Sequence, residues 1–286
     1  MSHVYAVTGA SGQLGRRVVA ELLDRGVDAS QVVAVVRTPD KVQDLAARGV
    51  QVREGDYDRP DTLTAALTDV DRVLLVSGSE IGQRVPQHTA VIQAAAKNGV
   101  GRVLYTSILK AGETGNPIAP EHVETEKVLR ASGVPYTILR NSWYIQVYTD
   151  QAEQYLATGK ILGATGGATI SGASRDDYAA AAAAALLDDT DGNRVHELGG
   201  PGFTMSDLAA AITEATGTDV TYEDLAPEAY REALLGAGLD EGTAGFLVAL
   251  DGSIAAGELV TDSDGLRSLL GRDPVSVRDT VRAQLG

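Results

Sequence analysis

Short, nearly continuous apolar runs alternate with amphipathic segments along the first half of the chain. Unbroken apolar runs are typical of parallel strands, because crossover helices cover both faces of the sheet. Repeated alternation of this kind predicts right-handed crossovers and a doubly wound, Rossmann-like α/β sheet. Strands are expected at residues 4–9, 31–37, 50–56, 72–77, 102–107 and 135–140.

Local signals mark where the intervening helices begin and end. Pro39 and Pro60 can each occupy a first helical turn, where the missing N–H group is not needed. Gly26 and Gly99 follow apolar periodic segments, as expected of residues just past a helix C-terminus. Local residues therefore predict where these helices begin or end.

The alternation stops after residue 140. An alanine-rich helix at 176–189 and a strand at 194–200 are expected to return to the main sheet, and the remainder is mostly helical in pattern. We therefore predict a first domain at residues 1–145, with 172–200 returning to it. Residues 146–286 are predicted to form a smaller, mostly helical lobe.

Composition narrows the class of protein. The chain has 286 residues, 44% of them hydrophobic, and no cysteine, which excludes disulfides and cysteine nucleophiles. A formal net charge of −15 without a basic run disfavours nucleic-acid binding. No apolar stretch approaches the length of a membrane span, so we expect a cytoplasmic protein that does not bind membranes. The histidines lack ligand-like spacing to one another, and no metal site is predicted.

A glycine-rich turn separates the first expected strand from the first helix. Gly9, Gly12 and Gly15 in "VTGASGQLG" permit a tight turn and close approach to a ligand, and the helix N-terminus offers free N–H groups to a pyrophosphate. This context predicts a dinucleotide site, with a purely structural turn as the alternative. The expected contacts are Thr8, Gly9, Ser11, Gly12, Gln13, Leu14 and Gly15.

Arg37 ends the second expected strand, where NAD-binding folds commonly carry an acidic residue. An arginine there can hold a 2′-phosphate, so NADPH (or NADP⁺) is the predicted cofactor. The alternative is an exposed arginine at a strand end. Asp56 is placed to reach the adenine or to cap the next helix. The ends of the third and fourth strands supply further expected cofactor contacts at Asp56, Tyr57, Ser77, Gly78 and Ser79.

Several segments resemble one family along almost the whole chain. "TGASGQLG", "SGSEIGQRVPQH", "HVETEKVLRASGVPYTILRN" and "RNSWY" are similar to the NmrA-like branch of atypical short-chain dehydrogenases. Within that branch the chain resembles the type 2 NAD(P)H:quinone oxidoreductases. The resemblance implies a Rossmann-like domain, a small C-terminal domain, and flavin-free hydride transfer from NADPH to a quinone between them.

The chain departs from the wider superfamily at its catalytic pair. Counting back from "LRASGVPYTILR", the Tyr and Lys positions of extended short-chain dehydrogenases fall on Ile118 and His122. On a helix, His122 and Glu126 share a face, whereas Lys127 is rotated away from it. We therefore expect His122 to face the cofactor, as a proton-transfer or positioning residue, and Lys127 to lie at the surface.

Residues near the ends of the fifth and sixth strands are candidates for the reaction site. Asn141 is placed to reach both the nicotinamide carboxamide and a substrate oxygen, and Trp143 and Tyr144 could stack on a flat quinone. Core packing at the domain junction is the alternative for these aromatics. Ser107 matches a superfamily serine and is expected to be a donor near the nicotinamide, or only a helix cap. The predicted catalytic residues are His122, Asn141 and Ser107, and the predicted substrate contacts are Asn141, Trp143 and Tyr144.

The missing Tyr–Lys pair bears on the substrate. Reduction of a carbonyl to an alkoxide needs a positioned acid, whereas hydride addition to a quinone gives a delocalised oxyanion that donors can stabilise. The leading hypothesis is an NADPH-dependent reductase of a small quinone. The alternative is a non-catalytic, NADP(H)-binding redox sensor of the NmrA type. Oligomeric state is left open, with a homodimer among the alternatives.

Overall fold

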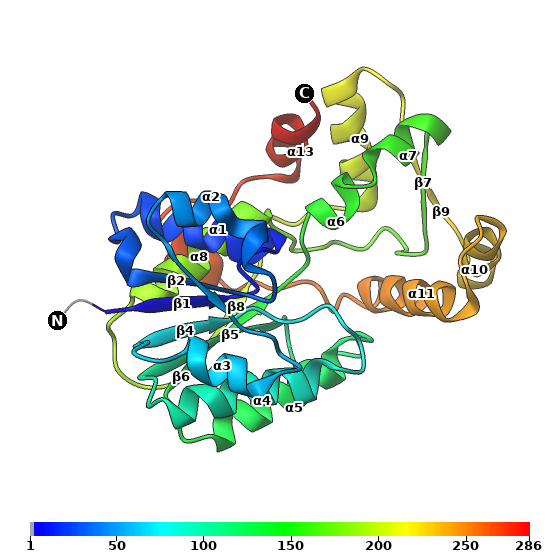
Figure 1. Ribbon diagram of the computed structural model, residues 1–286. Coiled ribbons are helices and arrows are strands. Elements are labelled where there is room, and N and C mark those ends of the chain that lie inside the picture. The colour runs from blue at the N-terminus through cyan, green and yellow to red at the C-terminus, as the bar shows by residue number, and fades with distance from the viewer. Residues whose placement is uncertain (1–2) are drawn as a thin grey trace.

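The computed structural model, which describes residues 3–286, contains a seven-stranded parallel sheet (Figure 1). The strands lie in the order β3-β2-β1-β4-β5-β6-β8, so the chain reverses direction across the sheet between β1 and β4. This is the doubly wound, Rossmann-like architecture that the sequence predicts. The strands are β1 (Tyr5–Thr8), β2 (Val32–Val36), β3 (Gln51–Glu54), β4 (Arg72–Leu75), β5 (Arg102–Ile108), β6 (Tyr136–Asn141) and β8 (Arg194–Leu198).

Helices cover both faces of this sheet (Figure 1). One face packs against α1 (Gln13–Asp24) and α8 (Arg175–Leu187), and the central strands are fully buried between the two layers. The alanine-rich sequence of α8 allows it to lie close to α1. The other face is covered by α3 (Pro60–Ala66), α4 (Arg84–Lys97) and α5 (Ala119–Ala131). The short η1 (Ala29–Gln31), η2 (Pro39–Val42) and α2 (Gln43–Ala47) complete the connections.

The expected helix boundaries are confirmed at the residues that signalled them. Pro39 and Pro60 each occupy a first helical turn, and Gly26 and Gly99 adopt φ values of +84° and +67° just past α1 and α4. Only glycine adopts such a conformation without steric cost. Residues 194–198 join the sheet beside β6, where Asn141 pairs with Leu198 and Arg140 with Glu197.

Most of the remaining elements surround a separate apolar cluster, on the right-hand side of Figure 1. A two-stranded parallel sheet of β7 and β9 lies among the helices and was not expected from the sequence, because both strands are short and only half-buried. The elements are α6 (Gln146–Thr149), α7 (Ala152–Thr158), β7 (Lys160–Gly163), α9 (Met205–Thr216), β9 (Thr221–Asp224), α10 (Pro227–Gly236), α11 (Glu241–Ala255) and α13 (Val277–Leu285).

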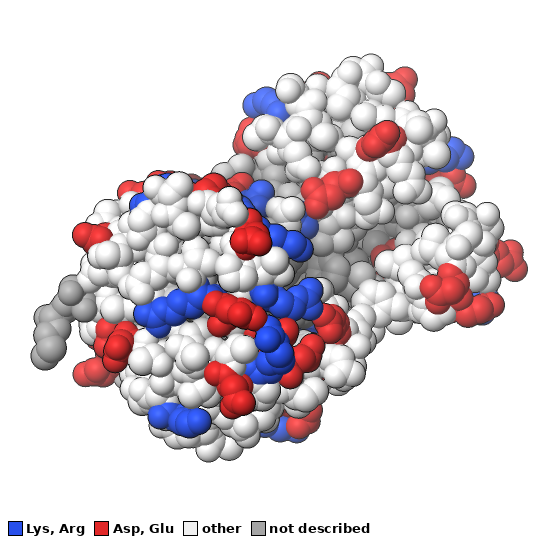
Figure 2. Space-filling view, in the orientation of Figure 1, with Lys and Arg blue, Asp and Glu red and all other residues white. Residues whose placement is uncertain are grey.

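One C-terminal helix leaves this group. The helix α12 (Gly265–Leu270) packs against α8 and β8, so the chain returns to the sheet a second time before α13. The division into residues 1–145 and 146–286 stays a prediction. Figure 2 shows a hollow between the larger and the smaller body, with basic and acidic side chains interspersed along its border. Among residues 3–286, no helix has the length and apolar character needed to cross a bilayer.

Candidate cofactor and active site

A cavity of about 590 Å³ opens at the carboxyl ends of β1, β2, β3 and β4. In doubly wound sheets, ligands bind at this edge beside the point where the strand order reverses. Most of the predicted cofactor residues line it. The lining consists of Gly9, Ser11, Gly12, Gln13, Leu14, Gly15, Arg37, Gly55, Asp56, Tyr57, Asp58, Val76, Ser77, Gly78, Ser79, Glu80, Gln87, Tyr144 and Arg175.

The three glycines have different steric roles in the turn between β1 and α1. Gly9 has a φ of +59°, which an L side chain rarely adopts. A Cβ on Gly15 would lie 2.5 Å from the carbonyl oxygen of Gly9, and one on Gly12 would lie 3.2 Å from the same atom. The first turn of α1 therefore packs directly on the backbone of the preceding loop, and any side chain at Gly15 would push the helix away.

The N-terminus of α1 is free to bind an anion. Gly12 is its N-cap and provides no side-chain acceptor, and the first turn contains no acidic residue. By contrast, α8 is capped by Ser174 and carries Asp176 and Asp177 in its first turn. Because uncapped N–H groups and the helix dipole attract negative charge, α1 fits a pyrophosphate and α8 does not.

Tyr57 ties the third strand's end to the glycine loop and to β4. Its hydroxyl lies 2.6 Å from Thr8 Oγ1 and donates to the carbonyl of Val76 at 3.0 Å. Burial raises the pKa of Tyr57 to about 12, so the phenol stays protonated. Thr8 is fully buried behind the cavity wall rather than part of it. Thr8 therefore supports the glycine loop from behind.

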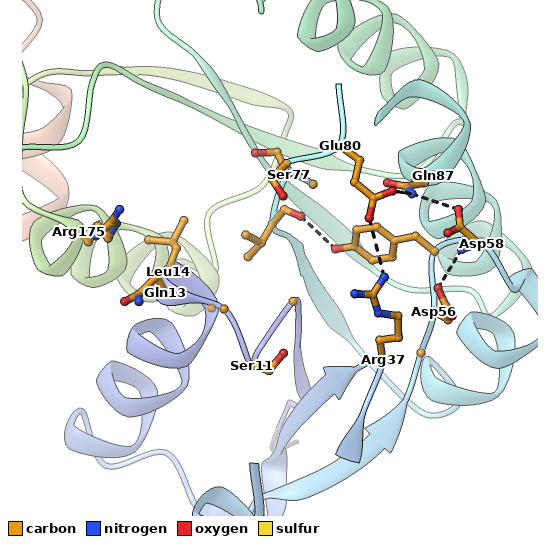
Figure 3. Close-up of a pocket in the computed structure, with 18 of the residues that line it drawn as sticks. Ser11, Gln13, Leu14, Arg37, Asp56, Asp58, Ser77, Glu80, Gln87 and Arg175 are labelled. Carbon is orange, nitrogen blue, oxygen red and sulfur yellow. Dashed lines mark hydrogen bonds and ion pairs between the residues drawn. The ribbon is translucent and has the colours of Figure 1, made fainter. Parts of the chain in front are cut away.

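Arg37 lines the opposite end of the cavity from Arg175, as Figure 3 shows. The Arg37 side chain is 66% exposed, and its Nη1 lies 3.8 Å from Glu80 Oε1. Glu80 Oε2 in turn accepts a hydrogen bond of 3.1 Å from Gln87 Nε2, which also reaches Asp58 Oδ1 at 3.1 Å. Arg37, which is expected to bind a 2′-phosphate, therefore faces the Glu80 carboxylate when no nucleotide is bound.

The loop that follows β4 is held by buried groups on α4. His88 Nε2 accepts a 3.0 Å hydrogen bond from the Gly78 N–H, and Arg84 Nε donates to the Gly78 carbonyl at 2.6 Å. Burial, with a contribution from the Arg84 guanidinium, lowers the pKa of His88 to about 3. A neutral His88 then donates from Nδ1 to Thr125 Oγ1 at 3.0 Å. Ser77, Gly78 and Ser79 therefore face the cavity from a rigid support.

Asn141 and Trp143 present buried polar atoms without a protein partner. Asn141 Nδ2 donates to the Tyr144 hydroxyl at 3.1 Å, but its Oδ1 accepts no hydrogen bond from the described residues. The indole N–H of Trp143 is also buried, and no described residue accepts a hydrogen bond from it. Buried polar atoms are nearly always satisfied, so an acceptor and a donor remain here for a ligand. Of these three residues only Tyr144 lines the cavity, and burial raises the pKa of its phenol.

His122, in α5, and Ser107, in β5, do not line the cavity either. His122 is buried, and its Nδ1 lies 2.7 Å from the Tyr105 hydroxyl. Burial, followed by the charge of Arg84, lowers the pKa of His122 to about 3. The imidazole is therefore neutral at physiological pH, and the structure does not bring it to the cavity. Its catalytic role stays a prediction.

Ser107 belongs to a buried ion-pair network. Its hydroxyl donates to Glu126 Oε1 at 2.7 Å, and Arg140 binds both oxygens of Glu126 at 2.9 and 2.8 Å. Arg140 also donates to Glu197 at 2.8 Å. Burial alone would raise the pKa of Glu126, but the hydrogen bonds from Arg140 and Ser107 outweigh it and hold the pKa below its usual value. Lys127 lies at the surface, as expected, and pairs with Glu124.

Six residues that line the cavity were not assigned from the sequence, namely Gly55, Asp58, Val76, Glu80, Gln87 and Arg175. Glu80 and Gln87 lie within the family-like segment "SGSEIGQRVPQH", but nothing local shows that they face Arg37. Asp58 follows the third strand, and Arg175 begins a helix far along the chain. The segment "SEIGQRVPQ" was a usable signal for the first two. No local pattern marks Arg175, because its place depends on the return of α8 to the sheet.

The fold and the cavity together define a dinucleotide-binding α/β protein. The family model described as NAD(P)H-binding matches residues 9–189. The chain is 43% identical to quinone oxidoreductase 2 of Escherichia coli over 277 residues, which is 96% of either chain. It is 32% identical over 294 residues to an NmrA-like oxidoreductase of Aspergillus flavus, covering 98% of this chain and 94% of the relative.

Solved structures show the same relationship. The NADPH complex of an NADPH-dependent quinone oxidoreductase from Escherichia coli matches with a TM-score of 0.94 and 42% identity, over 99% of this chain and 100% of the other. A triphenylmethane reductase of Citrobacter in complex with NADP(H) matches with a TM-score of 0.91 and 33% identity, over 98% and 100%. The chain belongs to the NAD(P)H-binding, NmrA-like family. The predicted fold and family are confirmed, and with them a nicotinamide dinucleotide cofactor.

Proposed function

We propose that the protein is an NADPH-dependent quinone reductase that passes hydride directly from the nicotinamide to a small quinone, without flavin. The observation that carries this proposal is the cavity at the sheet edge, with an uncapped α1 and Arg37 at its two nucleotide-binding positions. It is supported by similarity to a quinone oxidoreductase over 96% of the chain.

The cavity fits the cofactor at two places, and Asn141, outside its lining, offers a third contact. Free N–H groups at the start of α1 would hold the pyrophosphate, and Arg37 would hold the 2′-phosphate. The unpartnered Oδ1 of Asn141 would accept a hydrogen bond from the nicotinamide carboxamide. Bound NADPH supplies the hydride. The protein's own task is then to orient the ring and to receive the acceptor beside it.

The groups near Asn141 suit an acceptor that needs no strong acid. Hydride addition to a quinone gives a delocalised oxyanion, which the Trp143 indole N–H is free to stabilise because no described residue accepts its hydrogen bond. Tyr144 adds an aromatic face and a phenol that burial keeps protonated. The proton would come from water. Direct catalytic roles for His122 and Ser107 have less support, since neither residue lines the cavity, and Tyr105 and Glu126 engage His122 Nδ1 and the Ser107 hydroxyl.

Stopped-flow oxidation of NADPH tests the proposal. NADPH absorbance is followed with purified protein and a series of benzoquinones, against the uncatalysed reaction under the same conditions. The expected result is saturable acceleration with at least one simple quinone, and no flavin spectrum in the purified protein. A rate equal to the uncatalysed rate with every quinone would refute the proposed activity.

A redox-sensing role without turnover is the second candidate. It is favoured by one observation, the absence of the superfamily Tyr–Lys pair at Ile118 and His122. The same experiment separates the two functions, because a sensor would bind NADP⁺ tightly and leave the quinone unreduced. A cytoplasmic location and a homodimer stay predictions.

A further inference from the structure

The end of the cavity around Arg37 is acidic. Asp56, Asp58 and Glu80 all line it, and Arg37 is the cation among them (Figure 3). A 2′-phosphate carries about −1.5 to −2 charges near neutral pH, so three carboxylates around its binding residue oppose its arrival. Their individual surroundings decide which of them has the largest effect.

Asp56 already has partners of its own. Its carboxylate accepts hydrogen bonds from the Asp58 N–H at 3.2 Å and from Arg59 Nε at 3.3 Å. Arg59 also pairs with Glu54. The charge of Asp56 is therefore balanced within its own turn, and Arg37 is not needed for it.

Glu80 is directed at Arg37 by a buried amide. Gln87, which is 5% exposed, holds one carboxylate oxygen of Glu80, and the other oxygen faces Arg37 Nη1 at 3.8 Å. Gly78 lies so close to Gln87 that a Cβ there would be 3.3 Å from Gln87 Oε1. The glycine thus lets the amide reach across the loop. The Glu80 side chain is 52% exposed, and the buried Gln87 amide holds one of its two carboxylate oxygens.

We propose that Glu80 is a specificity-determining residue that sets the balance between NADPH and NADH. Its carboxylate occupies Arg37 when no phosphate is present, so the 2′-phosphate of NADPH must displace it and then lie beside its charge. NADH has a 2′-hydroxyl, which leaves the Arg37–Glu80 pair intact and can donate a hydrogen bond to a carboxylate. Glu80 therefore weakens NADPH binding and favours use of NADH as a second cofactor.

This inference rests on dinucleotide binding in the cavity and is independent of the electron acceptor. It is tested by isothermal titration calorimetry with NADP⁺ and NAD⁺, which requires no turnover. If neither nucleotide binds the wild-type protein, the proposed function fails. If both bind, the response of the Glu80 variant decides the inference by itself.

The decisive variant is Glu80→Gln, which removes the charge and keeps an oxygen that can accept from Gln87. The ratio of the Kd for NAD⁺ to the Kd for NADP⁺ should rise about three- to tenfold, because the lost charge is solvent-exposed and partly screened. The increase should shrink in 0.5 M salt, a concentration at which screening acts over about 4 Å. An unchanged ratio, or a shift toward NAD⁺, would overturn the inference.

Glu124→Gln is the matched control. Glu124 is 53% exposed against 52% for Glu80 and also pairs with a cation, Lys127, but it does not line the cavity. It changes the net charge by the same amount and should leave the ratio unchanged. Arg37→Gln tests whether Glu80 acts through Arg37. In the Arg37→Gln background, Glu80→Gln should change the Kd ratio by less than half as much as it does in the wild-type protein. An undiminished effect would show that Glu80 does not act through Arg37 and would overturn the proposed displacement.

Discussion

At the residue scale, the two ends of the Asn141 amide have different surroundings. The Nδ2 group donates to Tyr144, while Oδ1 is buried and accepts nothing from residues 3–286. A buried acceptor that receives no hydrogen bond costs about 1–3 kcal/mol of stability. Such an atom is therefore expected where a bound ligand donates the missing hydrogen bond. The carboxamide of a nicotinamide has the N–H donor that this oxygen needs.

Replacing Asn141 by leucine should lower kcat about 10- to 100-fold with NADPH and a benzoquinone, since the lost hydrogen bond orients the reacting ring. The Kd for NADP⁺ should change less, because the pyrophosphate and 2′-phosphate contacts remain. Steady-state kinetics and calorimetry measure the two quantities. Tyr144→Phe removes only the partner of Nδ2 and should have the smaller effect on kcat. Wild-type kcat in Asn141→Leu would contradict the assigned role.

At the element scale, the approach of α1 to the end of β1 decides whether the nucleotide site exists. The helix is amphipathic, with Val18, Val19 and Leu22 fully buried against the sheet and α8. Its first turn meets the Gly9 carbonyl, where the absence of a side chain at Gly15 allows the contact. The same contact directs the free N–H groups of α1 into the cavity.

Gly15→Ala should therefore destabilise the protein and weaken NADP⁺ binding together. A Cβ 2.5 Å from a backbone oxygen cannot be accommodated by a rotamer change, and overpacking of this kind costs about 1–3 kcal/mol. Urea unfolding and calorimetry measure both effects.

Gly252→Ala in α11 is the control for that variant, because an added Cβ there meets nothing within 4 Å. It should leave NADP⁺ affinity unchanged and stabilise the protein by up to about 1 kcal/mol through helix propensity. If Gly15→Ala behaved like Gly252→Ala, the close contact at α1 would have no energetic importance.

At the scale of the whole molecule, buried ionisable groups set the dependence of stability on pH. His88 and His122 have pKa values lowered to about 3, mainly by burial. The unfolded chain takes up protons on its histidines below their unfolded pKa of 6.5, whereas the folded chain does not. The free energy of unfolding is therefore at its full value above pH 6.5 and decreases as the pH falls below it. Asp251 acts oppositely. Burial raises its pKa to about 6, so it destabilises the fold increasingly as pH rises from about 4 to 6.

The two histidines outweigh Asp251 between pH 7.5 and 5.5. Over this range each histidine lowers the free energy of unfolding by about 1.4 kcal/mol and Asp251 raises it by less than 1, so the net fall should be about 2 kcal/mol. Urea unfolding at the two pH values measures the difference. His88→Gln keeps an acceptor for the Gly78 N–H and should remove about two-thirds of this difference, because one histidine accounts for about 1.4 of the net 2 kcal/mol. A variant with the wild-type pH dependence would contradict the assignment.

Much of the sheet and one end of the cavity could be predicted from local patterns. Strands such as β2 are continuous apolar runs, and the glycine loop precedes an amphipathic helix within a few residues. By contrast, β7 and β9 are short and half-exposed, and they pair with each other across about 60 residues, so no local period reveals them. His122 was singled out by counting along a helix, but counting could not show that Tyr105 would meet its imidazole.

The doubly wound sheet, the nucleotide turn and the arginine at the end of β2 follow from local sequence, because each depends on residues close together in the chain. The rest of the site depends on how distant segments pack. Glu80 meets Arg37, and Arg175 reaches the cavity, because loops and helices far apart in sequence converge at one sheet edge. Side-chain direction at that edge follows from strand register and helix packing, which no single segment encodes.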